Sequence, residues 1–325
     1  MAWEPGQSAI RPSWVLHRAA LHPVVIIAAT SLLLAACARP GKTAEPGSPD
    51  QPASSPTGGV GGANLVPPGY AGRFRVLATV LESPDHGPQL CAGVALSLPP
   101  QCGGLDVVGW DWDTVDHETA NGTTWGDYLV TGEWDEATTT FTLTEPATGI
   151  DEAPESERAI APTPDFRSPC PTPAGGWRPL DANRATNEAM DRAISAARAE
   201  PDFAGAWLDQ SYLREPGANE SDANDPKRLV LNLRFAGDLD RHDEQIRAIW
   251  GGALCLSRAA RPLSELEGIR SEVTAELGQL SSSLDEVAGI VQVTVTVATE
   301  SAQAKLDERY GPGVVLLNGW LRPID

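Results

Sequence analysis

Basic residues are scarce in this chain of 325 residues, in which 24 lysines and arginines stand against 44 aspartates and glutamates. The resulting formal charge of −20 repels the phosphate backbones of DNA and RNA, so the composition argues against nucleic-acid binding. It also argues against adhesion to anionic lipid through clusters of basic residues. Any association with a membrane therefore needs another source.

Histidine is also scarce, and catalytic motifs are missing from the sequence. After residue 37 only His86, His117 and His242 remain, and there is no GxSxG, HExxH, SxxK or P-loop motif. A pair of carboxylates could still act as acid and base, but nothing selects one pair among so many acidic residues. The sequence therefore predicts that the protein is not an enzyme and has no cofactor, with a carboxylate-based hydrolase as the alternative.

Long apolar runs are missing except near the start, where residues 24–36 (VVIIAATSLLLAA) carry no charge. At 1.5 Å per residue this run spans about 20 Å, which is short for a helix that crosses a bilayer. Arg11 and Arg18 precede it, as in the basic region of a secretory signal. We expect residues 1–36 to be a signal peptide, and an uncleaved membrane helix is the alternative.

The apolar run ends in Leu34-Ala35-Ala36-Cys37, which resembles the bacterial lipobox. The resemblance implies that a peptidase cuts before Cys37 and that this cysteine carries the acyl chains of a lipoprotein. Two chains hold a protein stably at a membrane, whereas one does so only marginally. The resemblance places the protein at the extracytoplasmic face of a bacterial cell membrane, with the membrane as a partner through the lipid on Cys37. The alternative is an ordinary signal in which the cysteine is accidental.

Four cysteines remain after Cys37, and an even number in an exported chain favours disulfide bonds. No CxxC or Cys/His spacing indicates zinc or a redox site. Four cysteines allow three pairings. We expect Cys91 to pair with Cys102 inside one β-rich segment, and Cys170 to pair with Cys255, because these two flank another segment.

Stretches rich in proline and glycine divide the rest of the chain. Residues 37–69 hold the lipidated cysteine and a linker that we expect to be disordered, because so few apolar side chains cannot form a core. Residues 146–180, rich in proline and acidic residues, predict an extended connector. The folded parts are then a small β domain at residues 70–145 and an α+β domain at residues 181–325.

The β domain shows the alternation of apolar and polar residues that is typical of strands. Five runs with period two lie near residues 74–80, 90–96, 108–112, 128–134 and 141–143. Five short strands suggest a small closed or nearly closed barrel. We expect an OB-like barrel.

Tryptophan gathers in the same segment, as Trp110, Trp112, Trp125 and Trp134. Exposed indole rings can stack on sugars, and OB-like barrels bind oligosaccharides. The shared strand faces of the other three predict that they fill the core. Trp125 falls in a predicted turn at residues 122–126, so it is the tryptophan that we expect to be exposed for ligand binding.

Acidic residues cluster at two places where a metal ion could bind. Asp111, Asp113 and Asp116 could bind calcium, but their stretch lacks the glycine and the terminal glutamate of an EF-hand, so a solvated loop is favoured. Asp238 and its acidic neighbours around His242 are expected to cap the start of a helix rather than to bind a cation.

The α+β domain contains an internal repeat. A strand, a helix, an aromatic residue followed by glycine, and a second strand occur twice, with Trp250 and Tyr310 at equivalent points. The repeat predicts a duplicated α+β sandwich, with helices on one face of a mixed sheet, and the fold class of the chain is α+β. A capping box at Ser264 and Glu267 predicts the start of one helix.

Several phrases resemble segments of uncharacterised secreted and lipid-anchored proteins of actinobacteria. The phrases include Leu90-Cys91-Ala92-Gly93-Val94, Trp125-Gly126-Asp127-Tyr128, Trp250-Gly251-Gly252-Ala253-Leu254-Cys255 and Arg309-Tyr310-Gly311-Pro312-Gly313. The resemblance assigns no functional residues. The sequence thus predicts a lipoprotein with a non-catalytic interaction or structural role toward an unknown envelope protein or glycan. A ligand-binding lipoprotein is the alternative, with carbohydrate at Trp125 or calcium at the three aspartates.

Overall fold

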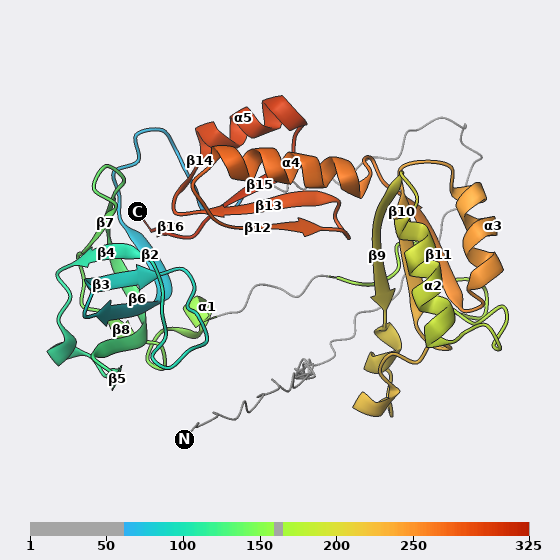
Figure 1. The fold of residues 1–325 in the computed structure, drawn as a ribbon, viewed down its shortest axis with the longest axis horizontal. Helices are drawn as coiled ribbons and strands as arrows, with labels where there is room; N and C mark the ends of the chain where they lie inside the picture. The colour runs from blue at the N-terminus through green and yellow to red at the C-terminus, as the bar shows by residue number, and fades with distance from the viewer. Residues whose placement is uncertain (1–61, 159–164, 325) are drawn as a thin grey trace, which may run out of the picture. The chain divides into compact units, whose positions relative to one another are not determined.

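The computed structural model describes residues 62–158 and 165–324 (Figure 1). The expected signal peptide, Cys37 and most of the first linker lie outside these residues. Within the described part, no helix is both long enough and apolar enough to cross a bilayer. The chain has a mixed α/β fold that combines a closed five-stranded barrel with two three-stranded sheets.

The barrel is a ring of five strands. They are β2 (Phe74–Ser83), β3 (His86–Cys91), β4 (Leu105–Val108), β7 (Thr140–Leu143) and β6 (Thr123–Asp135), in that order around the ring. Pairing between β6 and β2 closes the ring, and β4 and β7 form its one parallel pair. A five-stranded barrel was expected, and the ring confirms it.

Alternation along the strands fills the barrel. Val76 and Val80 of β2 point into a core that also holds Tyr128, Val130 and Phe141, and all five are almost completely buried. Because apolar side chains recur at every second position, each strand turns one face inward and one outward. The barrel thus follows directly from the period-two pattern.

Two predicted strands end earlier than expected. The second run was predicted to reach residue 96, but β3 ends at Cys91. The third was predicted to include Trp110 and Trp112, but β4 ends at Val108, because Gly109 adopts a φ of 85° that leaves the strand direction. A short 3-10 helix, η1 (Trp112–Thr114), follows instead.

Short strands complete the barrel. β5 (Glu118–Ala120) pairs with β6 through a tight turn at Asn121 and Gly122, whose φ values are 50° and 80°. β8 (Thr148–Gly149) also pairs with β6, and α1 (Glu155–Arg158) follows it. The predicted connector at residues 146–180 is therefore only partly extended.

The first three-stranded sheet has the order β11-β10-β9. Its strands are β9 (Phe203–Asp209), β10 (Val230–Phe235) and β11 (Ala253–Arg258), and β10 runs antiparallel to β9 and parallel to β11. Helices α2 (Asn187–Arg198) and α3 (Leu239–Ile249) share one apolar core with this sheet. Two 3-10 helices, η2 (Ser211–Arg214) and η3 (Glu220–Asp222), lie between β9 and β10.

The second three-stranded sheet has the order β12-β13-β15, with the same pattern of strand directions. Its strands are β12 (Gln279–Asp285), β13 (Ile290–Val295) and β15 (Val315–Gly319), and the helices of this part of the chain are α4 (Leu263–Glu276) and α5 (Glu300–Tyr310). The short strand β14 (Ala298–Thr299) follows β13 in the sequence but belongs to a separate two-stranded sheet. Figure 1 shows α4 and α5 on one side of β12 and β13, and the two helices share a core with the sheet. The predicted capping box is wrong, because the N-cap of α4 is Pro262 and Ser264 lies inside the first turn.

The two ends of the described chain cross over. β1 (Leu65–Val66) pairs with β14, whereas β16 (Arg322–Pro323) pairs with β2 of the barrel. Val66 is 4% exposed, so the last part of the predicted disordered linker is ordered. The apolar pair Leu65-Val66 provides the surface that the preceding residues lack.

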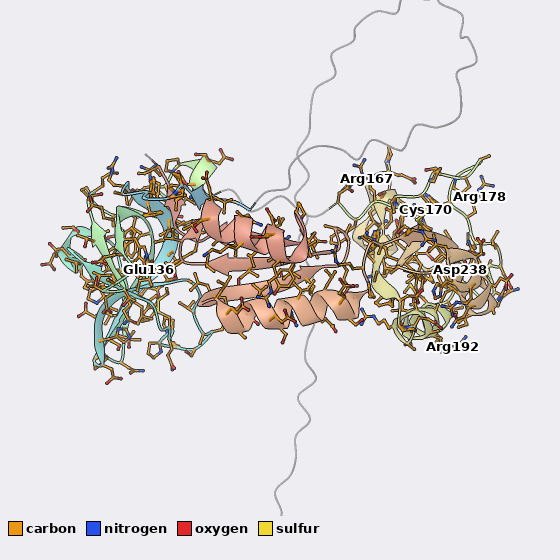
Figure 2. All side chains as sticks on the ribbon, turned by 90° about the horizontal axis from the view of Figure 1, so that it is seen from above. Glu136, Arg167, Cys170, Arg178, Arg192 and Asp238 are labelled. Atoms are coloured by element: carbon orange, nitrogen blue, oxygen red, sulfur yellow. A yellow bond between two sulfur atoms is a disulfide. The ribbon has the colours of Figure 1, made fainter. Side chains whose placement is uncertain are left out.

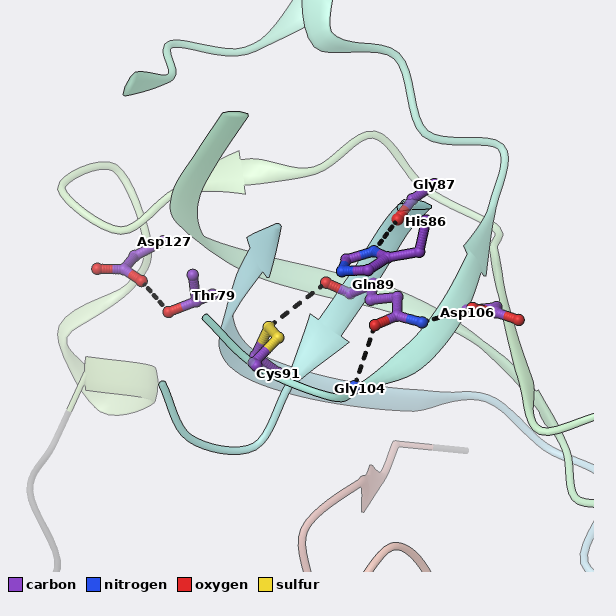
Figure 3. Close-up of a disulfide and its surroundings, with 9 residues drawn as sticks. Thr79, His86, Gly87, Gln89, Cys91, Gly104, Asp106 and Asp127 are labelled. Carbon is purple, nitrogen blue, oxygen red and sulfur yellow. Dashed lines mark hydrogen bonds between the residues drawn. A yellow bond between two sulfur atoms is a disulfide. The ribbon is translucent and has the colours of Figure 1, made fainter. Parts of the chain in front are cut away.

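The structure contains both predicted disulfides, with Cα–Cα distances of 5.9 Å for Cys91–Cys102 and 5.8 Å for Cys170–Cys255. The first closes a loop in which Leu96 and Leu98 are exposed. Gln89 secures this loop, because its side chain donates to Asp106 Oδ1 at 3.0 Å and accepts from the Gly104 N–H at 3.2 Å (Figure 3).

Candidate functional site

An open cleft lies where the parallel strands β4 and β7 end. Val107 pairs with Phe141 and Val108 with Thr142, so the two strands point the same way and their carboxyl ends meet at one edge. Beyond this edge, the two segments that follow β4 and β7 border a cleft of about 370 Å³. The lining residues are Gly109, Trp110, Asp111, Thr114, Val115, Leu143, Thr144, Glu145, Pro146 and Ala147.

Local hydrogen bonds form the first wall of the cleft. Asp111 Oδ1 accepts the N–H of Asp113 at 3.0 Å and so caps η1. The Thr114 hydroxyl donates to the Asp111 carbonyl at 2.8 Å. The wall therefore holds its shape through contacts between residues that are close in sequence.

Aromatic rings pack behind this wall. Trp110 lies edge-to-face against Trp112, with ring centroids 5.2 Å apart, and against Tyr128 at 4.9 Å. The Trp112 Nε1–H donates to Glu82 Oε2 at 2.6 Å. In contrast, the Nε1–H of Trp110 is buried and has no hydrogen-bond partner among the described residues. A buried donor without a partner costs about 1–3 kcal/mol.

Tyr128 is fixed as a hydrogen-bond donor. Its hydroxyl donates to the carbonyl of Asp116 at 2.6 Å. Burial, assisted by the negative charges of Asp127 and Asp116, raises the pKa of Tyr128 to about 12. The phenol therefore stays protonated at physiological pH and supports the aromatic cluster.

Two carboxylates flank the cleft. Glu145, on the wall that follows β7, pairs with Arg73 at 2.5 Å and with Arg75 at 3.9 Å. Asp111, on the opposite wall, is exposed, and no described residue forms an ion pair with it. The cleft thus offers hydrogen-bond acceptors and part of the Trp110 ring, whose N–H is buried without a partner among the described residues.

The predicted ligand residue Trp125 lies elsewhere. It is part of β6, where it pairs with Leu81 and Glu118, and it is only partly exposed. The turn was placed too late in the sequence, because the true turn is Asn121-Gly122, an Asn-Gly pair typical of tight hairpins. Trp110, expected in the core, does pack against the barrel core, but it is only partly buried and also lines the cleft.

The three aspartates predicted as calcium ligands are not gathered around one point. Asp111 lines the cleft, Asp113 is exposed, and Asp116 uses its backbone carbonyl to bind Tyr128. In the part of the chain that the structure describes, the group of at least three potential metal ligands whose ligand atoms all lie within 4.8 Å of one another consists of Glu200, Asp202 and His242. Sequence reasoning missed this group, since its members lie about 40 residues apart.

His242, one of the three members of this group, is completely buried. Its ring stacks on Phe235 with centroids 3.7 Å apart, and its Nε2 lies 2.9 Å from Asp202 Oδ2. Asp238 caps α3, as expected, by accepting the Asp240 N–H. His242 does not join that cap but points toward the residues that precede β9.

A guanidinium group already occupies the centre of the group. Arg241 lies 2.9 Å from Glu200 Oε2 and 3.7 Å from Asp202 Oδ1. Burial raises the pKa of Asp202, but the hydrogen bond and charge of His242 and the charge of Arg241 together lower it below its ordinary value. The three ligand atoms could hold a metal only if Arg241 moved away. As it stands, the group joins α3 to the start of β9.

No known protein-family model matches the sequence, and a search of curated proteins finds no match to it.

Proposed function

We propose that this chain is a lipid-anchored protein of the bacterial cell envelope, and that its barrel binds a glycan without catalysing a reaction. The sequence Leu34-Ala35-Ala36-Cys37 supports the anchor. The two disulfides support export to an oxidising compartment. The glycan is the envelope partner in this proposal.

The observation that carries the binding role is the orphaned indole donor of Trp110. It belongs to a residue that lines an open cleft, next to Asp111, whose carboxylate forms no ion pair with a described residue. A sugar hydroxyl could donate to the carboxylate of Asp111, and it could accept from the Trp110 N–H if ligand binding exposes this buried group. Because both nearby acids are negative, the cleft favours neutral or amino sugars over acidic ones.

The order of strands in the barrel supports the OB-like interpretation. Numbered along the chain, the ring runs 1-2-3-5-4 and closes on strand 1, with strands 3 and 5 parallel, as expected for an OB-like barrel. Proteins with this fold include oligosaccharide binders. This likeness of fold adds weight to a glycan ligand but does not choose one.

The two three-stranded sheets support a duplication. Each follows the order helix, strand, antiparallel strand, helix, parallel strand. We infer that they are copies of one α+β unit, and that they serve as a scaffold and interaction surface beside the barrel.

A glycan-binding assay tests the cleft. The full chain is titrated with neutral oligosaccharides from the bacterial envelope, and Trp110→Phe is compared with Trp125→Phe as the matched control. Trp110→Phe keeps an aromatic ring but removes the N–H, so we expect binding about 5-fold weaker. Trp125→Phe should bind as the wild type does, because Trp125 does not line the cleft.

A second variant removes the negative charge of Asp111 and keeps the N-cap of η1. Asp111→Asn still caps η1, since asparagine is as good an N-cap as aspartate. Loss of the charged acceptor should weaken binding about 10-fold. Wild-type affinity in both Trp110→Phe and Asp111→Asn would refute the glycan site.

Palmitate labelling of the wild type and of Cys37→Ala tests the anchor separately. We expect label on the wild type alone. Label on both proteins, or on neither, would contradict the lipoprotein assignment. Neither result would affect the proposal that the cleft binds a glycan.

A further inference from the structure

The sheet of β9, β10 and β11 has a second face that its helices do not cover. Leu231, Leu233 and Phe235 of β10 point into the core shared with α2 and α3. Side chains alternate across a strand, so Asn232 and Arg234 point to the opposite face. The pairing register adds Trp207 and Cys255 beside Asn232, and Ser257 beside Arg234.

A disulfide fixes a segment of the chain across this second face. Cys170, which is labelled in Figure 2, is bonded to Cys255 of β11. Both cysteines pack with Trp177 against Val230 and Ala253. Upstream of the disulfide, the Ser168 N–H donates to Asp209 Oδ2 at 2.7 Å. The segment therefore covers one part of the face and leaves a recess beside it.

That recess is a pocket of about 330 Å³. Its lining residues are Asp165, Arg167, Pro169, Trp207, Arg234, Ser257, Arg258 and Val287. Three arginines thus face one small space in a protein whose formal charge is −20. The one carboxylate in the lining, Asp165, is already paired with Arg167 at 2.5 Å.

The other two arginines donate to backbone carbonyls, and the negative charge of Asp285 also acts on Arg234. Neither Arg234 nor Arg258 forms an ion pair with a residue that the structure describes. Arg234 donates instead to the carbonyls of Glu286, at 3.2 Å, and Val287, and Arg258 donates to the Ala236 carbonyl at 3.4 Å. Burial lowers the pKa of Arg234, which reflects a partly desolvated charge that an anion would stabilise.

Unpartnered polar atoms gather on the same face. The Nε1–H of Trp207 and the hydroxyl of Ser257 are buried without hydrogen-bond partners in the described structure, and both residues line the pocket. Trp207 is 8% exposed, so its indole N–H has little access to water as a hydrogen-bond acceptor. Buried donors of this kind are normally paired, and a cluster of them beside two arginines that form no ion pair with a described residue indicates a missing acceptor.

We propose that this pocket binds a small oxyanion, the carboxylate or phosphate group of a solute, between Arg234, Arg258, Trp207 and Ser257. Guanidinium groups bind both oxyanions through paired N–H donors, and the indole and hydroxyl donors supply further contacts. A cation is excluded by the arginines. This site is separate from the barrel cleft and does not depend on the glycan proposal.

The test follows the indole N–H resonance of Trp207 by NMR in the full chain. Inorganic phosphate, acetate and chloride are added at equal ionic strength. We expect a saturable shift with phosphate or acetate and none with chloride, and the tighter of the two identifies the group that the pocket prefers. A shift that chloride reproduces, or no saturable shift with either oxyanion, would overturn the proposal.

Variants assign the binding to the pocket. Arg258→Gln removes an exposed guanidinium and should weaken anion binding about 10-fold. The control is Arg178→Gln, which should have no effect, because Arg178 is exposed on the segment that contains Cys170 but does not line the pocket. Calorimetric titration of Trp207→Phe, which lacks the N–H, should show about 5-fold weaker binding. Unchanged affinity in Arg258→Gln would contradict the site even if Trp207→Phe fails to fold. Trp110→Phe should keep wild-type anion binding, which distinguishes this site from the cleft.

Discussion

The barrel cleft and the pocket on the β9-β10-β11 sheet differ in charge although they belong to one acidic chain. The cleft presents Asp111 and Glu145, whereas the pocket presents three arginines and one carboxylate. Each contains a buried indole N–H without a partner, from Trp110 and Trp207 respectively. Net charge therefore says little about an individual site. The residues that line a cavity determine its ligand class.

The two cavities are also held together differently. The cleft wall depends on Gly109, the Asp111 cap and Thr114, which are neighbours in sequence. The pocket depends on a segment attached to β11 by the Cys170–Cys255 bond, whose cysteines are 85 residues apart. The cleft should thus survive changes that destroy the pocket.

Removing the disulfides should have the largest effect on this comparison. Loop entropy predicts a loss of about 4.5 kcal/mol for the double variant Cys170→Ser with Cys255→Ser, and about 3 kcal/mol for Cys91→Ser with Cys102→Ser, because their separations are 85 and 11 residues. Urea unfolding of both double variants measures the difference. We also expect the first variant to lose anion binding and to keep glycan binding. Equal stability losses, or anion binding that survives in the first variant, would break the comparison.

A smaller effect is expected at the group of charged residues around Asp202 that joins α3 to the start of β9. Asp202→Asn removes the negative partner of His242 and Arg241 and should cost about 2 kcal/mol near neutral pH. The lowered pKa of Asp202 means that its contribution is present above the ordinary aspartate value of about 4 and is lost as pH falls through the folded-state value. Urea midpoints of wild type and variant should therefore converge below about pH 4.

The control for this prediction lies in the barrel. Asp127→Asn, in which the altered carboxylate accepts from the exposed Thr79 hydroxyl at 2.6 Å and from no other described side chain, should change stability much less than Asp202→Asn. A difference between wild type and Asp202→Asn that stays constant from pH 7 to pH 3 would contradict the assigned role of Asp202. Neither variant should alter binding at the cleft.

Much of the framework could be predicted because its signals are local. Period-two alternation located the five barrel strands, and the even count of cysteines after Cys37 suggested a complete set of disulfides. Errors arose where one backbone residue decides the outcome. Gly109 ends β4 before Trp110, and Asn121-Gly122 moves the turn away from Trp125.

The two cavities could not be predicted because they depend on register between distant segments. Arg234 meets Ser257 only through the parallel pairing of β10 with β11, and Gly109 meets Leu143 only because β4 runs beside β7. The crossover of β1 and β16 joins residues more than 200 positions apart. One sequence signal was present, since Asn232 and Arg234 interrupt an otherwise apolar strand and mark a polar second face.

The indole N–H resonance of Trp110 provides the most direct test of the proposed glycan site. In ¹⁵N NMR spectra of the full chain, titration with a neutral envelope oligosaccharide should shift this resonance in a saturable manner, because a hydroxyl oxygen of the ligand becomes its missing acceptor. The resonances of Trp125 and Trp207 should stay unchanged. A shift confined to Trp125, or saturable binding that leaves the Trp110 resonance where it was, would contradict the assignment of the cleft as the binding site.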